Sequence, residues 1–229
     1  MIIRIKKEVF SNFHPKLRIA VIKAANLDNQ AKLKESIHML HEVEQMVRMT
    51  FHKTKVKDHS LIEPWRIAQE ELGKKARPYH TSVEQLLRTV LAHKSVAAKD
   101  VLTNLTHYLS LKYVVPFGLD DGDKVTGDLT FSLSTGRERA GALKRVKKGE
   151  LYYADDKAVL GTKLDYWKSK KTILTSSSKS AVIHLEALPP VKSSELNQIA
   201  KETGNLIASF CGAKVKTAVL HKKKNFVII

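Results

Sequence analysis

The sequence is poor in cysteine. Its 229 residues contain only one, Cys211, so neither an internal disulfide nor a cysteine-rich zinc site can form. The neighbours of Cys211 in LIASFCGAKV are apolar, which favours a buried small side chain over a reactive thiol. A lone thiol fits a reducing compartment, and we expect the protein to be cytoplasmic.

Long hydrophobic runs are also missing. No segment approaches the ~20 apolar residues needed to cross a bilayer. The first ten residues, MIIRIKKEVF, are too short and too charged for a signal peptide. The glycine motifs G-x-x-x-x-G-K-[ST] and G-x-G-x-x-G are absent as well, which disfavours nucleotide-driven phosphoryl transfer. We therefore predict no membrane partner and no cofactor.

Acidic residues are outnumbered. There are 23 Asp and Glu against 40 Lys and Arg, a formal net charge of +17. Residues 137–224 hold 19 of the basic residues and 8 of the acidic ones, a net of +11. Such an excess attracts polyanions and favours phosphate contacts. A nucleic-acid partner is the favoured interpretation, and a merely solvated lysine-rich surface is the alternative.

Hydrophobic periodicity predicts an α+β fold. Spacings of three and four residues predict helices at 30–52, 61–72, 81–91, 99–111 and 193–211, with Asp28 or Asn29 capping the first, Thr81 or Ser82 the third, and Gly212 ending the last. Strands are predicted at 2–10, 16–24, 128–134, 150–154, 157–160, 173–174, 180–188, 215–220 and 226–229. Helices that precede most strands argue against a regularly alternating α/β fold.

Two polar clusters are candidates for metal or ligand chemistry. His38 and His41 lie about one helical turn apart, but a polar rim on a helix is the favoured interpretation over a metal site. Asp120, Asp121 and Asp123 suit Mg²⁺ or a ligand amine, and equally an ordinary turn, which we favour. We predict no metal site.

Three basic tracts are candidates for nucleic-acid contact: RERAGALKRVKK at 137–148, KLDYWKSKK at 163–171, and the lysines at 222–224. The second interleaves Tyr166 and Trp167 with lysines. Aromatic faces stack on unpaired bases while lysines neutralise phosphates. The alternative is a hairpin whose aromatic rings pack in the core.

Six segments taken in order resemble the B3/4 domain, the editing module of the phenylalanyl-tRNA synthetase β subunit. They are SVEQLLRTVL, NLTHYLSLKYVVPFG, LDDGDKVTGDLTF, ELYYADDKAVL, YWKSKKTILTSSS and AVIHLEAL, between Thr81 and Pro189. The chain looks most like free-standing members of the family. The resemblance implies helices packed on a β-sandwich-like mixed sheet, with a pocket beside the helix at 99–111. In the synthetase, this module hydrolyses tRNA mischarged with tyrosine.

The sequence departs from the synthetase pattern at three places. Gly118 stands where the pattern has a histidine, Asn104-x-x-His107 replaces Asp-x-x-Asn, and Trp167 stands where a glutamate reads the tyrosine hydroxyl. The amino acid recognised is therefore left open.

The resemblance and the basic tracts together assign candidate roles to fourteen positions. His107, Asn104 and the Gly118 backbone would hold the reacting water and carbonyl. The expected substrate-binding residues are Tyr108, Pro116, Phe117, Trp167 and Asp155, and the expected RNA-binding residues are Arg137, Arg139, Lys163, Lys168, Lys170 and Lys171.

The expected organisation is an N-terminal α/β extension at 1–76, a B3/4-like core at 77–190, and a C-terminal helix and strands at 191–229 that complete one domain. The leading hypothesis is hydrolysis of mischarged aminoacyl-tRNA in trans, with tRNA or another RNA as partner and an aminoacyl group or free amino acid as ligand. A non-catalytic RNA- or DNA-binding module and an amino-acid-binding regulator are the alternatives.

Overall fold

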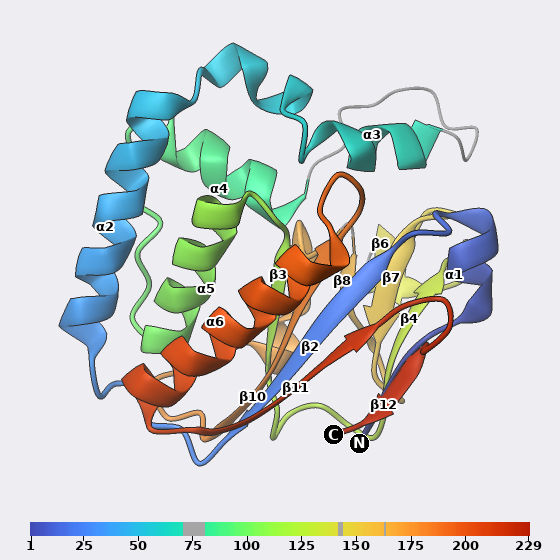
Figure 1. Cartoon of the computed structure of the whole chain (residues 1–229). Helices are drawn as coiled ribbons and strands as arrows, with labels where there is room; N and C mark the ends of the chain where they lie inside the picture. Colours follow the sequence, from blue (N-terminus) through green and yellow to red (C-terminus); the bar gives the residue numbers. More distant parts are fainter. Residues whose placement is uncertain (71–80, 142–143, 163) are drawn as a thin grey trace.

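Two main β-sheets, a separate two-stranded ribbon and a layer of helices make up the described part of the fold (Figure 1). The computed structural model describes residues 1–70, 81–141, 144–162 and 164–229. Its elements are β1 (Ile2–Ile5), α1 (Lys7–Asn12), β2 (Arg18–Ala25), α2 (Leu33–Thr50), the 3-10 helix η1 (Lys53–Asp58), α3 (Glu63–Glu70), α4 (Ser82–Val90), α5 (Val101–Tyr113), β3 (Phe117–Asp121), β4 (Leu129–Leu133), β5 (Arg139–Ala140), β6 (Lys144–Arg145), β7 (Leu151–Ala154), β8 (Val159–Thr162), β9 (Trp167–Lys168), the 3-10 helix η2 (Lys170–Thr172), β10 (Ser180–Ala187), α6 (Ser193–Cys211), β11 (Lys214–Leu220) and β12 (Phe226–Ile228).

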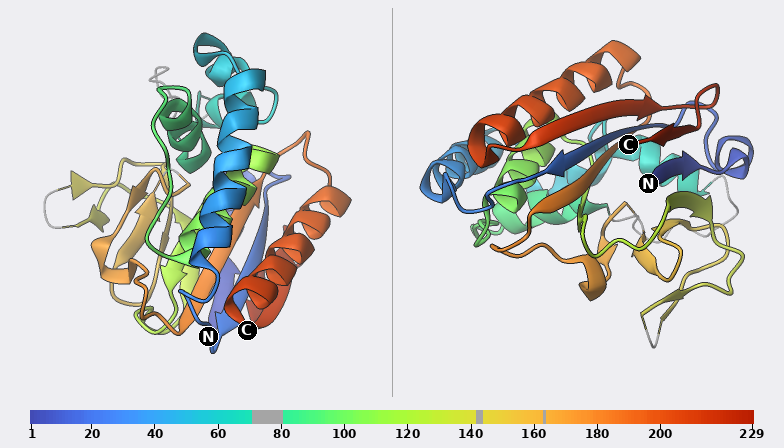
Figure 2. Two further views of the ribbon diagram at one scale, coloured as in Figure 1. Left: turned by 90° about the vertical axis from the view of Figure 1, so that its left-hand side faces the viewer. Right: turned by 90° about the horizontal axis from the view of Figure 1, so that it is seen from below.

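The two sheets lie face to face beneath the helices (Figure 2). The four-stranded sheet has the strand order β11-β2-β10-β3, and the six-stranded sheet has the order β12-β1-β4-β7-β8-β9. The six-stranded sheet is mixed, because β1 pairs parallel with β4 and antiparallel with β12. The predicted α+β class, with helices on a sandwich-like mixed sheet, is confirmed.

Strand β2 shows how the sequence builds three layers. Successive side chains of a strand point to opposite faces. Ala20 and Ile22 face the helices α5 and α6, while Ile19 and Val21 face the six-stranded sheet. Because both faces are covered, β2 is apolar almost throughout and lacks the alternation of a half-exposed strand.

Helix ends follow the sequence signals in two places. Thr81 caps α4 and forms a capping box with Glu84, as the sequence predicts. Gly212 ends α6 in the left-handed conformation, with φ of 63°. Cys211 is buried, also as expected.

Other local predictions are wrong. Residues 7–12 form helix α1 and do not continue the first strand. Asp120 and Asp121 lie buried in strand β3, which was expected to be a turn. Ile173 and Leu174 follow η2 and form no strand. Each error falls on a segment of six residues or fewer, where tertiary contacts override local preference.

The predicted cap of the first long helix has another role. Helix α2 begins at Leu33. Asn29 does not cap it and instead caps α5, a helix that comes much later in the sequence. The Asn29 side-chain oxygen accepts a hydrogen bond from the Leu102 amide at 2.9 Å, and its amide donates to the Asp100 carboxylate at 3.2 Å. Asp100 also accepts from the Thr103 amide at 2.9 Å. This fixes the start of the helix that carries the candidate site.

The three segments predicted from the sequence, 1–76, 77–190 and 191–229, each contribute strands to both large sheets. Strand β2 comes from residues 1–76, β10 and β3 come from 77–190, and β11 comes from 191–229, all in the four-stranded sheet. The predicted boundary at 76/77 lies outside the described residues. None of the helices that the structure describes is long and apolar enough to cross a lipid bilayer.

Candidate functional site

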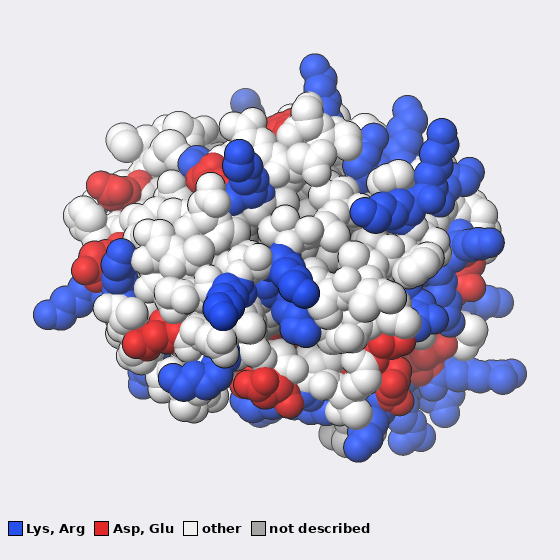
Figure 3. All heavy atoms as spheres, turned by 60° about the horizontal axis from the view of Figure 1, so that its bottom comes forward, with Lys and Arg blue, Asp and Glu red and all other residues white. Residues whose placement is uncertain are grey.

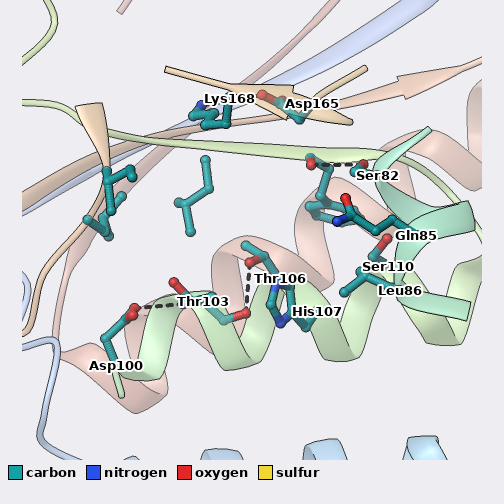
Figure 4. A pocket seen from close by; sticks show the side chains of 14 residues that line it. Ser82, Gln85, Leu86, Asp100, Thr103, Thr106, His107, Ser110, Asp165 and Lys168 are labelled. Atoms are coloured by element: carbon teal, nitrogen blue, oxygen red, sulfur yellow. Dashed lines mark hydrogen bonds and ion pairs between the residues drawn. The ribbon is translucent and has the colours of Figure 1, made fainter. Parts of the chain in front are cut away.

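A cavity of about 360 Å³ opens between α4, α5 and the edge strand β3. Figure 4 shows its lining. Helix α5 forms the floor in that view, α4 closes one side, and the residues around β9 lie opposite α5. Its residues are Ser82, Gln85, Leu86, Asp100, Thr103, Thr106, His107, Ser110, Phe117, Leu119, Asp165, Lys168, Ile173 and Leu174.

Helix α5 presents a polar stripe to this cavity. Thr106, His107 and Ser110 lie three, four and seven residues after Thr103, which places all four on one helical face. The apolar residues of α5, such as Leu105, pack instead into the core beneath α6. The helix is therefore polar toward the cavity and apolar toward the sheet.

His107 is the titratable base of this stripe. Its Nδ1 lies 2.8 Å from the carbonyl oxygen of Val96. Because a carbonyl can only accept, Nδ1 must carry the proton, and a neutral ring then has a lone pair on Nε2. Burial lowers the pKa of His107, although the Val96 carbonyl and the Asp100 carboxylate oppose this effect. The ring is thus neutral at physiological pH.

Strand β3 divides two environments. Phe117 and Leu119 point into the cavity, and the intervening Gly118 faces the interior between the sheets, paired in register with His184 of β10. Asp120 follows on the same inner side and is fully buried. Its Oδ2 lies 3.0 Å from the Tyr153 hydroxyl oxygen.

A charged pair lines the cavity opposite α5. Lys168 Nζ lies 3.4 Å from Asp165 Oδ1 and 2.7 Å from Asp120 Oδ2. Asp165 has a φ of 59°, unusual for a residue with a side chain. A Cβ added to Gly118 would lie 1.8 Å from Asp165 Oδ2, and one added to Gly161 would lie 2.5 Å from Asp165 Oδ1. The two glycines therefore leave the space that the Asp165 carboxylate occupies.

The structure brings together only part of the predicted catalytic set. His107 lines the cavity, and Gly118 lies directly behind its wall. Asn104 points elsewhere, because its Oδ1 accepts from the Ala98 amide at 2.7 Å and its Nδ2 donates to Ser36 Oγ at 3.1 Å. Asn104 therefore ties α5 to α2 and the loop before α5.

The predicted substrate-binding residues are dispersed. Phe117 lines the cavity, whereas Pro116 is buried and its carbonyl accepts from the Glu186 amide at 3.4 Å. Tyr108 packs among the helices. Trp167 packs instead in a small cluster with Ala140, Val146 and Val159.

Asp155 belongs to a turn. Its Oδ1 accepts from the amides of Lys157 at 2.9 Å and Ala158 at 2.8 Å, and its Oδ2 accepts from the Thr126 amide at 2.8 Å. Lys171 forms an ion pair with the same carboxylate.

The predicted RNA-binding residues fall into three groups. Arg137, Arg139 and Lys170 are exposed, and no ion pair is found for them among the described residues. Lys168 and Lys171 are held by carboxylates, as described above. Lys163 lies outside the described residues.

Sequence reasoning missed Asp165, His184 and Glu186, and it assigned Lys168 to RNA binding and not to the cavity wall. The polar stripe on α5 had a readable signal in its helical spacing. His184 and Glu186 also had one, since they stand two residues apart on the inner face of an otherwise apolar strand. Asp165 had none, because its position depends on a left-handed bend between β8 and β9. Within the described part of the chain, no three His, Cys, Asp or Glu side chains gather as metal ligands do.

Comparison with known proteins places the chain in a family. Residues 65–211 match the B3/4 domain, and the chain belongs to that family. The fold is similar to an N-terminal fragment of the phenylalanyl-tRNA synthetase β-subunit from Pyrococcus horikoshii, with a TM-score of 0.44 and 9% sequence identity over 93% of this chain and 49% of that one. The chain thus spans about half the length of that fragment. No curated protein sequence matches it.

Proposed function

We propose that this protein binds the aminoacylated 3′ end of a tRNA and hydrolyses the aminoacyl ester in the α5 cavity. Membership of the B3/4 family and the resemblance to its editing module support the proposal. One observation carries it: the cavity holds a neutral imidazole, His107, whose Nδ1 is fixed by the Val96 carbonyl and whose Nε2 has no hydrogen-bond partner among the described residues.

The chemistry requires only a water molecule and this base. The water gives a proton to His107 Nε2 as its oxygen attacks the ester carbonyl carbon. The bond to the ribose oxygen then breaks, and that oxygen takes the proton back, which releases a free amino acid and deacylated tRNA. Thr103 and Gln85 line the same cavity and supply donors for the carbonyl oxygen.

No covalent nucleophile is needed. Burial raises the pKa of the Cys211 thiol to about 12, so its thiolate is scarce at neutral pH. The residue is the last one of α6 and packs in the core between the helices and the four-stranded sheet, and it is not among the cavity residues.

The basic charge of the chain supports the RNA half of the proposal. Figure 3 shows Lys and Arg crowded on the right-hand side of the face that it draws, with fewer toward the left. Arg137, Arg139 and Arg145 are exposed on or beside the β5–β6 hairpin. Guanidinium groups of this kind contact phosphates without reading sequence.

Deacylation of a panel of mischarged tRNAs tests the proposal. We expect at least one substrate to be deacylated faster than in buffer, and His107→Ala to abolish that excess. His38→Ala removes an exposed imidazole from α2 and serves as the matched control, which should retain full activity. If every substrate decays at the buffer rate, the hydrolase proposal is wrong.

The cavity volume favours an amino-acid-binding regulator as second candidate. About 360 Å³ is near the lower end of ligand pockets, roughly 300–1,000 Å³, and suits a small ligand. Calorimetry with free amino acids distinguishes the two. Saturable binding without deacylation supports the regulator, and RNA binding without either supports a non-catalytic RNA- or DNA-binding module.

A further inference from the structure

Five ionisable side chains contact one another in succession. The series begins at Glu186 in the interior between the sheets, reaches the cavity wall at Asp165 and Lys168, and ends at the buried Asp120. Glu186 Oε1 lies 2.5 Å from His184 Nδ1, and His184 Nε2 lies 3.3 Å from Asp165 Oδ2. Asp165 Oδ1 lies 3.4 Å from Lys168 Nζ, which lies 2.7 Å from Asp120 Oδ2. We call this set the charged array. Only Asp165 and Lys168 line the cavity.

The signs of the array alternate only if His184 carries a charge. A neutral imidazole has one N–H and one lone pair. Because each ring nitrogen faces a carboxylate oxygen, a neutral His184 would turn its lone pair toward one of them. An imidazolium hydrogen-bonds Glu186 through Nδ1 and places its positive charge 3.3 Å from Asp165 Oδ2, where Nε2 makes no hydrogen bond to any described residue, and so separates the two carboxylates.

Bulk solvent does not reach this pair. His184 is fully buried, and Glu186 is 1% exposed. The rings of Tyr153 and Phe131 meet the imidazole edge-on, with centroids 4.4 and 5.1 Å away. A buried carboxyl group is costly unless it is paired or protonated, and His184 is the cation that lies within hydrogen-bond distance of Glu186.

The groups that face His184 agree with a charged ring. Burial lowers its pKa and Lys168 also opposes the charge, but Glu186 and Asp165 outweigh both and raise the pKa overall. Burial raises the pKa of Glu186 too, although the neighbouring His184 opposes this effect. The Asp165 carboxylate beside the other ring nitrogen favours protonation of His184.

We propose that His184 is a positioning residue that, as an imidazolium clamped between Glu186 and Asp165, fixes the Asp165–Lys168 pair in the wall of the α5 cavity. The inference rests on the proposed function for its effect on activity, but the charge of the ring is a separate and directly measurable claim.

The imidazolium matters because it helps to determine where the Asp165 carboxylate lies. Asp165 is held in a left-handed conformation between Gly118 and Gly161 and accepts a hydrogen bond from the Tyr153 hydroxyl at 2.7 Å. Without the imidazolium, the Asp165 and Glu186 carboxylates would repel each other across the ring site. Asp165 would move, and its ion pair with Lys168 in the cavity wall would change, while Lys168 would keep its closer contact with the buried Asp120.

Nitrogen-15 NMR of the histidine rings in the unmodified protein tests the charge. We expect two protonated ring nitrogens for His184 at pH 7.5, whereas His107 should give a neutral ring with the proton on Nδ1. A neutral His184 at that pH overturns the proposal, whatever the activity of the protein.

A double-mutant cycle tests the clamp. His184→Gln leaves two facing carboxylates, and Glu186→Gln in the same chain removes one of them. We therefore expect the double variant to be more stable in urea than His184→Gln alone. Strictly additive losses would show that the ring only fills space, and would contradict the proposal.

Activity completes the test. His184→Gln should lower kcat for deacylation by roughly 10- to 100-fold, as misplaced active-site groups do, and change its pH profile. Phe131→Leu, which removes a ring packed on His184 without touching a charge, should leave both unchanged. Equal losses in the two variants would overturn the positioning role. If the unmodified protein deacylates nothing, the proposed function fails, while the NMR and stability results still decide the clamp.

Discussion

At the scale of single residues, two interior histidines have opposite surroundings. His107 faces a backbone carbonyl, and its burial lowers its pKa. His184 lies between two carboxylates, which raise its pKa despite complete burial. A histidine side chain is therefore neutral at His107, which lines the cavity, and charged at His184, which lies behind the cavity wall. The sequence predicted His107, but it offered no way to see which nitrogen would be fixed.

The lowered pKa of His107 predicts an unusual pH profile. A base acts only when unprotonated, so a lowered pKa keeps His107 active below the ordinary range for histidine. We expect the deacylation rate to stay level as the pH falls through about 6.5 and to decline only below it. Single-turnover rates across this range check the expectation. A decline centred at the ordinary histidine pKa would contradict it.

Gly118 is predicted to tolerate no side chain. Its Cβ would lie 1.8 Å from Asp165 Oδ2 and 2.0 Å from His184 Cε1. We expect Gly118→Ala to destabilise the protein by about 1–3 kcal/mol or more, as overpacking does, measured by urea unfolding. Gly204→Ala is the control: its Cβ would lie 3.3 Å from Val215 Cγ1, and the helical preference of alanine offsets this crowding to within about 1 kcal/mol. Equal effects would contradict the close approach.

At the scale of elements, the long helices and paired strands were predictable and their partners were not. Helix α5 carries apolar residues at helical spacing and a capping aspartate, Asp100, immediately before it. The second cap, Asn29, comes from 73 residues earlier than the Leu102 amide it binds. Contacts at such separation leave no local pattern, and β3 was missed for the same reason, since its pairing with β10 defines it.

Asn29 is predicted to stabilise α5. Asn29→Ala removes the acceptor of the Leu102 amide and the donor to the Thr175 carbonyl at 2.9 Å, and leaves buried groups without partners. We expect a loss of about 1–3 kcal/mol in the free energy of unfolding. Asp28→Ala, an exposed neighbour, should cost less. If both variants unfold at the same urea concentration, Asn29 does not cap α5.

The turn between β4 and β5 is predicted to weaken in acid. Burial opposes the charge of Glu138, but hydrogen bonds from Ser134 at 2.5 Å and from the Thr135 amide at 3.2 Å lower its pKa to about 2. A lowered carboxylate pKa contributes stability above its unfolded value of about 4.5, and this is lost as the pH falls toward 2. Glu138→Gln should therefore destabilise at pH 7 and have little effect near pH 2. Thermal unfolding at both pH values measures this difference.

At the scale of the whole molecule, the class of fold followed from the order of helices and strands, and the position of the cavity did not. The cavity lies where the edge strand β3 meets α5 and where Asp165 and Lys168 close the gap. Which strand forms an edge depends on pairings across the entire chain. The charge excess was readable from composition, but ion pairs that bind Lys168 and Lys171 were not.

Exposed arginines should dominate the salt dependence of RNA binding. Each phosphate contact contributes a slope of about −0.7 in log K against log salt on single strands. Replacing Arg137 and Arg139 with alanine should make the slope less negative by about one to two units. Lys171→Ala is the control, because Asp155 already neutralises Lys171, and its slope should match that of the unmodified protein. Filter binding between 50 and 200 mM salt, a range in which phosphate contacts are strongly screened, measures all three.

The alternating signs behind the cavity also restrict how this protein can diverge. Losing the imidazole alone leaves Glu186 without a charge partner in the interior, and losing Glu186 alone removes the only hydrogen-bonded carboxylate of the His184 ring among the described residues. A descendant chain avoids both losses by exchanging His184 and Glu186 together, so we expect these two positions to change as a pair.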